Sequence, residues 1–188
     1  MKIVVGIIGA SGAPYAKRLL EVLAESEGVE LAACLSETAS EVWATEIGGD
    51  VREHLASLRV PFFGLRDYRA PFASGSAGWD AMILAPCSMS TVARVAHGIS
   101  DTLLTRAADV MLKEKRALVV VPRETPLSVI HLENLTALAR AGATIVPAMP
   151  AFYNKPETLA DAVDTVVARV LDHVHVSHAI GKRWGTKS

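Results

Sequence analysis

The sequence predicts one α/β domain of three layers, α/β/α, built around a doubly wound and mostly parallel sheet. Short, continuous apolar runs alternate with longer segments whose apolar residues recur at helical spacing. The runs lack the alternation of a strand with one wet face, which indicates strands that helices cover on both sides. At 188 residues, 51% of them hydrophobic, the chain is expected to form a single domain.

The strands are expected where apolar residues run without interruption, and the third is the weakest. They are placed, in order, at Ile3–Ile8, Glu30–Leu35, Val60–Phe63, Ala81–Ala85, Ala117–Val121 and Thr144–Val146. Helices are expected at Ala13–Glu25, Thr38–Ile47, Thr91–Ala96, Thr102–Lys113, Val129–Ala141 and Pro156–Leu171. Arg66–Trp79 has no clear period and is expected to be a functional loop. The single domain 1–188 is expected to end in a C-terminal tail from about residue 173.

Composition excludes several classes of function. The 19 Lys and Arg residues nearly balance the 20 Asp and Glu residues, which disfavours a nucleic-acid surface. The first apolar run, Ile3–Ile8, is too short for a signal peptide or a membrane span. The two cysteines, Cys34 and Cys87, fit reduced, buried thiols in a cytoplasmic protein.

A glycine turn, Gly9-Ala10-Ser11-Gly12, follows the first strand and opens the first helix. Its small residues let backbone N–H groups and the positive end of the helix approach an anion such as phosphate. The dinucleotide pattern GxGxxG is absent, and Ser36 ends the second strand where a ribose-binding acid would stand. A mononucleotide therefore fits better than NAD, and a plain strand-to-helix turn is the alternative.

A second turn, Pro86-Cys87-Ser88-Met89-Ser90-Thr91, follows a later strand and brings three hydroxyl groups to a helix start. These groups could cap the helix or bind phosphate oxygens, and the sequence does not decide between the two. Cys87 has no histidine nearby in sequence to activate it. A buried structural thiol is therefore favoured over a nucleophile.

Charged residues mark two further places. Arg106 and Lys113 lie on one face of a predicted helix, roughly 10 Å apart at a rise of about 1.5 Å per residue. They could hold a phosphate or a diphosphate from two sides, or Arg106 could simply pair with Asp109. Arg123-Glu124 directly follows a buried strand, where doubly wound sheets bind ligands, although an ion pair would also explain it.

Glu46 is the candidate proton-transfer group. Its neighbours in the helix are mostly apolar, so burial could raise its pKa toward neutrality, although most helical glutamates do no such work. The histidines at 173, 175 and 178 are spaced by two or three residues, and no carboxylate accompanies them at ligand spacing. We therefore expect no metal site.

Seven short blocks occur in one order along nearly the whole chain. They are Gly9-Ala10-Ser11-Gly12-Ala13, Ala44-Thr45-Glu46, Pro71-Phe72-Ala73-Ser74-Gly75-Ser76, Pro86-Cys87-Ser88, Arg106-Ala107-Ala108-Asp109-Val110 with Leu112-Lys113-Glu114, Pro122-Arg123-Glu124-Thr125-Pro126 and Pro147-Ala148-Met149-Pro150-Ala151-Phe152-Tyr153. Together they resemble the bacterial flavin prenyltransferases, formerly called 3-polyprenyl-4-hydroxybenzoate carboxy-lyases or phenolic acid decarboxylase subunits.

This resemblance implies a Rossmann-like flavoprotein with FMN as its cofactor and prenyl acceptor. The residues implied for FMN are Gly9, Ala10, Ser11, Ser36, Ser88, Met89, Ser90, Thr91 and Arg123. Those implied for dimethylallyl phosphate are Ser74, Gly75, Arg106, Lys113, Tyr153 and Arg169, some of them from neighbouring subunits of a homo-dodecamer. The catalytic residues implied are Ser11, Glu46, Lys113, Arg123 and Glu124.

The reaction implied by the resemblance joins the dimethylallyl group to N5 and C6 of reduced FMN, while Glu46 and the released phosphate move protons. The prenylated FMN would serve a partner, a UbiD-type decarboxylase. Fixed cations suit a leaving phosphate, and no DDxxD cluster for magnesium occurs in the sequence. We therefore expect a prenyltransferase that needs no metal.

Two positions depart from the family's pattern. Glu37 stands where many relatives have lysine, and Ile8 replaces a frequent threonine or serine before Gly9. Either change could alter contacts with the flavin without changing the reaction.

Two alternatives to a prenyltransferase remain open. An FMN-dependent cysteine decarboxylase relies on an active-site histidine and a Pro-Ala-Ser-Ala-Asn type motif. Here the corresponding stretch is Phe72-Ala73-Ser74-Gly75-Ser76, and His54 has no matching context. A non-catalytic flavin carrier would keep the phosphate turns but would not need Glu46, Lys113 and Arg169 together.

Overall fold

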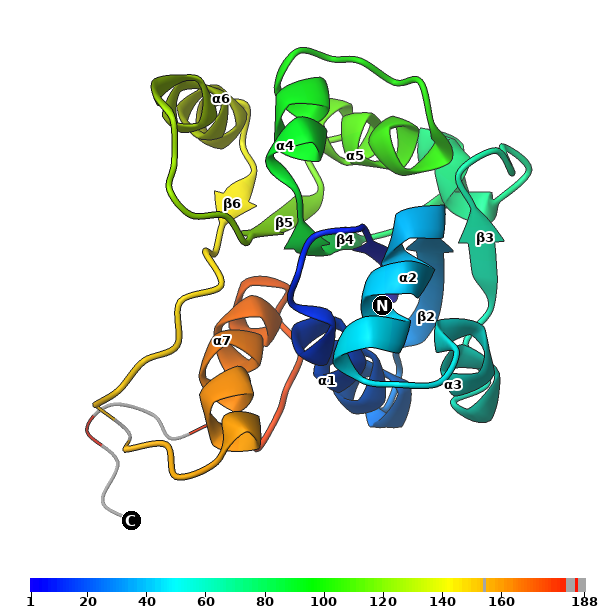
Figure 1. Ribbon diagram of the computed structural model, residues 1–188. Helices are drawn as coiled ribbons and strands as arrows, with labels where there is room; N and C mark the ends of the chain where they lie inside the picture. The colour runs from blue at the N-terminus through cyan, green and yellow to red at the C-terminus, as the bar shows by residue number, and fades with distance from the viewer. Residues whose placement is uncertain (154, 182–184, 186–188) are drawn as a thin grey trace.

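The apolar runs form a six-stranded sheet in the order β3-β2-β1-β4-β5-β6, and all its pairings are parallel. The computed structural model describes residues 1–153, 155–181 and 185 (Figure 1). The strands are β1 Lys2–Ile7, β2 Glu30–Leu35, β3 Phe62–Gly64, β4 Ala81–Cys87, β5 Ala117–Pro122 and β6 Thr144–Ile145. The helices are α1 Ala13–Glu25, α2 Glu37–Glu46, α3 Val51–Ser57, α4 Met89–Ala96, α5 Leu103–Lys113, α6 Val129–Arg140 and α7 Leu159–His173.

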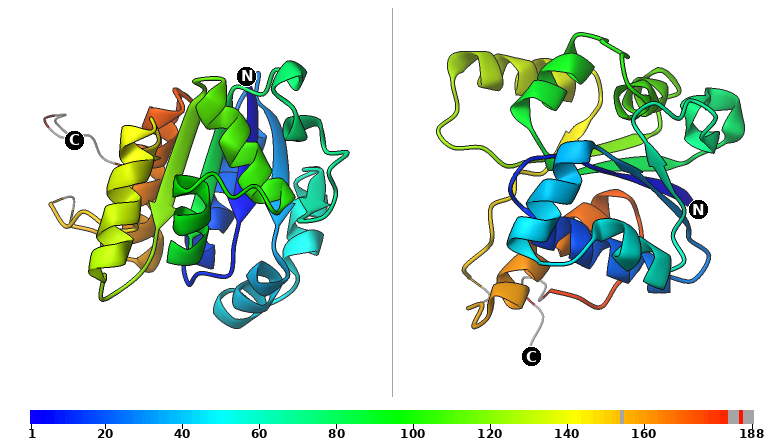
Figure 2. Two further views of the ribbon diagram at one scale, coloured as in Figure 1. Left: turned by 90° about the horizontal axis from the view of Figure 1, so that it is seen from above. Right: turned by 45° about the vertical axis from the view of Figure 1, so that its right-hand side comes forward.

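Two helical layers cover the sheet, so the doubly wound architecture is confirmed. Helices α1, α2, α3 and α7 lie on one face, and α4, α5 and α6 lie on the other (Figures 1 and 2). Alternate residues of a strand serve the two layers: Val5 of β1 packs with the first group and Val4 with the second. Burial on both faces explains why the interior positions of the long strands are apolar without alternation.

Strand order reverses between β1 and β4. From β1 the chain adds β2 and β3 on one side, and then returns to place β4, β5 and β6 on the other. The connections therefore diverge at the carboxyl ends of β1 and β4, which leaves a crevice where such sheets bind ligands. The glycine turn follows β1, and the hydroxyl turn follows β4.

Helix starts differ from the predicted ones where a hydroxyl caps the helix. Ser36 accepts a hydrogen bond from the N–H of Ala39, so α2 begins at Glu37. Ser88 does the same for Thr91, so α4 begins at Met89. Helix α7 begins at Leu159 rather than Pro156, because Thr158 caps it.

Two elements near β3 correct the sequence-based expectation. Helix α3, Val51–Ser57, was not expected, because its seven residues contain only two buried apolar side chains, Val51 and Leu55. Asp50 caps it by accepting a hydrogen bond from the N–H of Arg52. Strand β3 covers Phe62–Gly64 instead of Val60–Phe63, because residues 62–64 pair with β2.

The segment Arg66–Trp79 is anchored in the core rather than standing free. Its two short 3-10 turns, Pro71–Ala73 and Gly75–Ala77, flank the exposed Ser74. Phe72 and Trp79 are buried, and their rings meet edge to face at a centroid distance of 5.5 Å. The aromatic anchors on either side therefore hold the polar tip of the segment in place.

Both cysteines are free and buried. Burial raises the pKa of the Cys34 thiol to about 12, and it raises the pKa of Cys87 as well. The expectation of structural thiols at these positions is confirmed. Among the described residues, no helix is long and apolar enough to cross a membrane.

Candidate functional site

A cavity of about 300 Å³ lies at the reversal of strand order. Its lining comes from residues that follow β1, β2, β3 and β4 and from α2, α4 and the start of α5. The lining residues are Ile8, Gly9, Ser36, Thr38, Leu65, Ser88, Ser90, Thr91, Arg94, Thr102, Leu104 and Thr105. Seven hydroxyl groups and one guanidinium face apolar Ile8, Leu65 and Leu104, which is a lining suited to a flat, phosphate-bearing ligand.

The wall formed by β1 and β2 requires glycine at position 9. A Cβ atom there would lie 2.3 Å from Thr38 Oγ1. Thr38 Oγ1 lies 2.9 Å from Ser36 Oγ, so the two hydroxyl groups and the Gly9 backbone form one polar wall. Of the two departures from the family pattern, Ile8 lines this wall and Glu37 is exposed at the start of α2.

The wall formed by β4 and α4 is a cluster of hydroxyl groups. Ser88 Oγ lies 3.1 Å from Ser90 Oγ and 3.1 Å from Thr91 Oγ1. Ser88 also caps α4, so this one residue both caps the helix and lines the cavity. Met89, which the sequence grouped with these residues, is instead buried among apolar side chains.

A carboxylate occupies the N-terminus of α1. The N–H groups of Gly12 and Ala13 donate to Glu46 Oε2 at 2.9 Å and 2.8 Å. Gly12 has φ of 125°, a conformation that favours glycine. The turn after β1 thus faces the cavity at Gly9 and holds the end of α2 at Gly12.

The expected rise in the Glu46 pKa is wrong. Burial raises this pKa, but hydrogen bonds from the Ser11 side chain and from the Gly12 and Ala13 backbones outweigh it, together with the charge of Arg123. The pKa of Glu46 therefore lies below its ordinary value of 4.5, so the carboxyl group is ionised at neutral pH. Four favourable partners, none of them local in sequence, outweigh the apolar neighbours on α2.

Arg123 joins the end of β5 to the glycine turn. Its Nε donates to the carbonyl oxygen of Ser11 at 3.0 Å. Its charge also acts on Tyr15, whose pKa is raised by burial and lowered in smaller part by Arg123. Glu124 is exposed and accepts from the N–H of Thr125, so it does not pair with Arg123. Ser11, Glu46 and Arg123 therefore form one polar cluster beside the cavity.

A second group of predicted site residues lies along α5. Arg106 Nε donates to the carbonyl oxygen of Ala73 at 3.2 Å, and Arg106 Nη1 lies 3.6 Å from Asp109. Lys113 pairs with Glu114 at the end of the helix. The alternative pairing of Arg106 with Asp109 is thus present, although the guanidinium also holds the segment that contains Ser74.

Arg169 belongs to the opposite face of the sheet. It lies on α7, which packs with α1, and its Nη1 pairs with Asp172 at 2.8 Å. Lys113 lies on α5 in the other helical layer. One chain therefore does not bring Arg169 and Lys113 to one phosphate. Tyr153 is 55% exposed in the segment between β6 and α7.

Sequence reasoning missed four polar residues of the cavity: Thr38, Arg94, Thr102 and Thr105. Thr102 and Thr105 form a capping box at the start of α5, and Thr105 is buried. Arg94 pairs with Asp101. The predicted start of a helix at Thr102 could have identified Thr102 and Thr105, because the start of α5 lies at the same cavity as the starts of α2 and α4.

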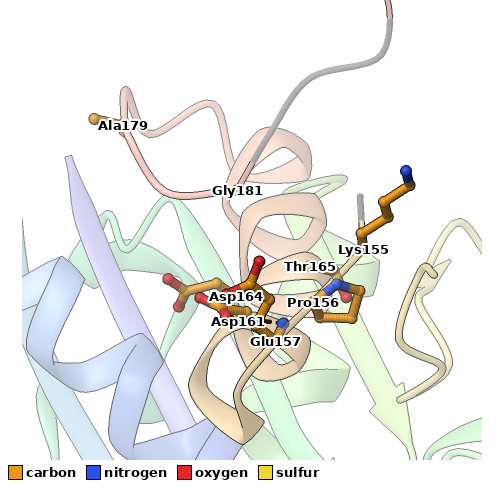
Figure 3. Close-up of a pocket in the computed structure, with 8 residues that line it drawn as sticks. All are labelled: Lys155, Pro156, Glu157, Asp161, Asp164, Thr165, Ala179 and Gly181. Carbon is orange, nitrogen blue, oxygen red and sulfur yellow. Dashed lines mark hydrogen bonds between the residues drawn. The ribbon is translucent and has the colours of Figure 1, made fainter. Parts of the chain in front are cut away.

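A larger cavity, of about 450 Å³, lies beside the start of α7 (Figure 3). The carboxyl groups of Glu157, Asp161 and Asp164 gather there, and Asp164 accepts two hydrogen bonds from Arg18. Three acids repel a phosphate, so this cavity does not suit the ligand that the glycine turn indicates. In the described part of the chain, no group of three His, Cys, Asp or Glu side chains could hold a metal ion.

The chain is similar to known proteins over nearly its whole length, including the residues that line the cavity. The family model described as Flavoprotein matches residues 1–184. The flavin prenyltransferase UbiX of Methanocaldococcus jannaschii is 44% identical, over 99% of this chain and 100% of that protein. The cavity and the Ser11, Glu46 and Arg123 cluster both lie within the matched regions.

Two solved structures share the fold. The dodecameric FMN-dependent Ubix-like decarboxylase from Escherichia coli O157:H7 is 47% identical with a TM-score of 0.95, over 99% of this chain and 100% of that one. AnUbiX (PadA1), in complex with FMN and dimethylallyl pyrophosphate, is 40% identical with a TM-score of 0.93, over 100% and 98% of the two chains. Both likenesses cover every strand that lines the cavity.

Gly9→Ala should weaken FMN binding by about tenfold or more, because the new methyl group must displace Thr38 from the cavity wall. Titration of flavin fluorescence measures the dissociation constant. Gly64→Ala is the matched control, since a Cβ at residue 64 has no atom within 4 Å. Equal affinities for the two variants would show that the β1–β2 wall does not contact the flavin.

Proposed function

The chain belongs to the Flavoprotein family, and within it to the flavin prenyltransferases, and we propose that it prenylates reduced FMN with dimethylallyl phosphate. The carbon–oxygen bond of the ester breaks as the prenyl carbon bonds to N5, which loses a proton, and inorganic phosphate leaves. The carbon–carbon double bond of the prenyl group then takes up a proton as its other end bonds to C6, and C6 loses its own proton. The observation that carries the proposal is the Glu46 carboxylate, which lies beside Ser11 and Arg123 next to a hydroxyl-lined cavity.

The residues around the cavity fit FMN. Ser36, Ser88, Ser90 and Thr91 offer hydroxyl groups to a phosphate at the N-termini of α2 and α4. Ile8, Leu65 and Leu104 offer an apolar surface to an aromatic ring system. Reduced FMN, when bound, supplies the nucleophilic atoms of the reaction.

Glu46 is suited to accept a proton. Its lowered pKa keeps it ionised near neutral pH, and each prenylation of a flavin position must release a proton. Two backbone N–H groups fix one carboxylate oxygen, and the Ser11 side chain also bonds to the carboxylate, so the orientation of the proton acceptor is set. The phosphate that leaves is the second proton acceptor in the scheme.

Cations supply the remaining stabilisation. Arg106, Lys113, Arg123 and Arg169 carry fixed charge, and a phosphate monoester carries about two negative charges at neutral pH. Because α5 and α7 lie on opposite faces of the sheet, these cations can meet only if neighbouring subunits contribute them. The proposed active site is therefore shared between chains.

Exposed apolar side chains support such an assembly. Val129 and Ile130 of α6 are 70% and 67% exposed, and Phe152 in the segment after β6 is 77% exposed. Exposed apolar groups of this size at neighbouring elements suit contacts between subunits. We propose a homo-dodecamer, like the dodecameric relative from Escherichia coli O157:H7.

We further propose that the product passes to a UbiD-type decarboxylase, which would use the prenylated flavin as its cofactor. Free, buried cysteines and near-neutral charge suit a cytoplasmic enzyme that meets its partner there. A transfer assay with purified decarboxylase apoprotein would detect this step.

The proposed activity is tested by anaerobic incubation with reduced FMN and dimethylallyl phosphate, followed by mass measurement of the flavin. The flavin should gain the mass of a prenyl group in excess EDTA, because arginine and lysine replace magnesium. Arg123→Lys should lower the rate by about tenfold, since lysine cannot form the two-oxygen fork. Parallel runs with the diphosphate ester decide between the two leaving groups, and magnesium-dependent turnover would contradict the cationic site.

Glu46→Gln should slow ring formation by about 100-fold or more and leave FMN bound, because it removes the proton acceptor and keeps its size. The variant should also lose less stability than the wild type when the pH is lowered. A depressed pKa stabilises the fold above pH 4.5, and this contribution is lost as the pH falls through the folded-state value. Single-turnover absorbance and thermal unfolding at several pH values measure both effects, with exposed Glu41→Gln on the same helix as control.

Ile130→Glu should reduce the assembly to smaller species and abolish prenyl transfer while FMN still binds. A charge at a buried subunit contact costs several kcal/mol, whereas each chain forms its own flavin cavity. Light scattering measures the mass, and Thr136→Glu at an exposed polar position of α6 is the control. A wild type that is monomeric and active would overturn the shared site.

A further inference from the structure

The polar tip of the segment before β4 is attached to α5 at two points. Arg106 Nε donates to the carbonyl oxygen of Ala73, and Arg116 Nη2 donates to the carbonyl oxygen of Gly75 at 2.8 Å. Arg116 lies in the turn between α5 and β5, 41 residues from Gly75 in sequence. The exposed Ser74 between these two carbonyl groups is therefore held from both sides.

Arg116 is an unusual group to bury. Its side chain is only 24% exposed, and its Nη1 is a buried atom without a hydrogen-bond partner among the described residues. Burial of a guanidinium with an unsatisfied donor costs free energy. The contact with Gly75 is thus a specific constraint rather than a solvated surface pairing.

Gly75 lies so close to the Glu114 carboxyl group that a Cβ atom at residue 75 would overlap with it. A Cβ at this position would lie 2.3 Å from Glu114 Oε1 and 2.7 Å from Glu114 Cδ. Gly75 is buried, although the serines on both sides are exposed. Any side chain at residue 75 would therefore force the Glu114 carboxyl group out of its position.

Glu114 lies between the two cations at the end of α5. Its Oε1 accepts a hydrogen bond from Lys113 Nζ at 2.5 Å, and its Oε2 lies 4.0 Å from Arg116 Nη2. The hydrogen bond and charge of Lys113 lower the pKa of Glu114, so the carboxyl group is ionised. Glu114 therefore links the position of the Lys113 ammonium to the position of the Gly75 backbone.

We propose that Glu114 and Arg116 are positioning residues for the prenyl phosphate. Arg116 fixes the Gly75 carbonyl, and Glu114 sets the Lys113 ammonium relative to it, so that Ser74, Gly75 and Lys113 meet the ester in one fixed arrangement. This inference rests on the proposed function, for which the family resemblance implies Ser74, Gly75 and Lys113 as residues that bind the ester. Neither Glu114 nor Arg116 touches the flavin cavity.

The test is a double-mutant cycle with Arg116→Ala, Glu114→Ala and the double variant, in the prenylation assay with the full chain. Each single change should raise KM for dimethylallyl phosphate by about tenfold and leave kcat and the FMN dissociation constant within about twofold. The double variant should be no worse than the poorer single variant, because the two side chains act as one unit. Arg116→Lys should recover part of the loss, since lysine can donate one hydrogen bond to Gly75.

Lys115→Gln is the matched control, because it removes a neighbouring exposed cation and should leave KM unchanged. An unchanged KM in the Arg116 and Glu114 variants, independent effects that multiply, or equal losses of FMN affinity would each overturn the positioning role. If Arg116→Ala does not fold, Arg116→Lys and Glu114→Ala decide the question by the same KM measurement. Absence of product from the wild type would overturn both proposals, whereas an active wild type with unaffected variants would overturn only this one.

Discussion

The reversal of strand order between β1 and β4 is the constraint on which the candidate site depends. In a parallel sheet buried on both faces, every crossover helix begins at the carboxyl edge, so helix N-termini gather there. The reversal separates the connections at one point of that edge and leaves a cavity between the starts of α2, α4 and α5. Capping hydroxyls of Ser36, Ser88 and Thr102 are thereby turned into cavity walls without losing their structural role.

The protein divides its helix N-termini between two kinds of anion. The N–H groups at the start of α1 are taken by Glu46, an internal carboxylate. The starts of α2 and α4 still face the cavity, where a ligand phosphate can use them. The glycine turn therefore has two roles. It lines the cavity at Gly9, and at Gly12 it stabilises the ionised acid that the proposed chemistry needs.

The sequence predicted the elements whose signals are local and missed the contacts that join distant segments. Continuous apolar runs located the six strands, and the observed pairing of Arg106 with Asp109 is one of the two alternatives that their spacing left open. The pKa of Glu46 was misjudged because its neighbours on α2 were visible, whereas Gly12 lies 34 residues away. Arg116 gave no signal, since its role depends on a carbonyl group in another element.

The placement of the cations connects chemistry to assembly. Lys113 and Arg169 lie in helical layers separated by the sheet, and each is paired with an acid in its own chain, Glu114 or Asp172. A single chain thus keeps these two cations neutralised and apart. A neighbouring chain that covers the exposed apolar side chains of α6 would also bring its own cations to the flavin edge. Under the proposed function, the ester meets its full set of charges only where subunits meet, so that leaving-group stabilisation is confined to the assembled enzyme.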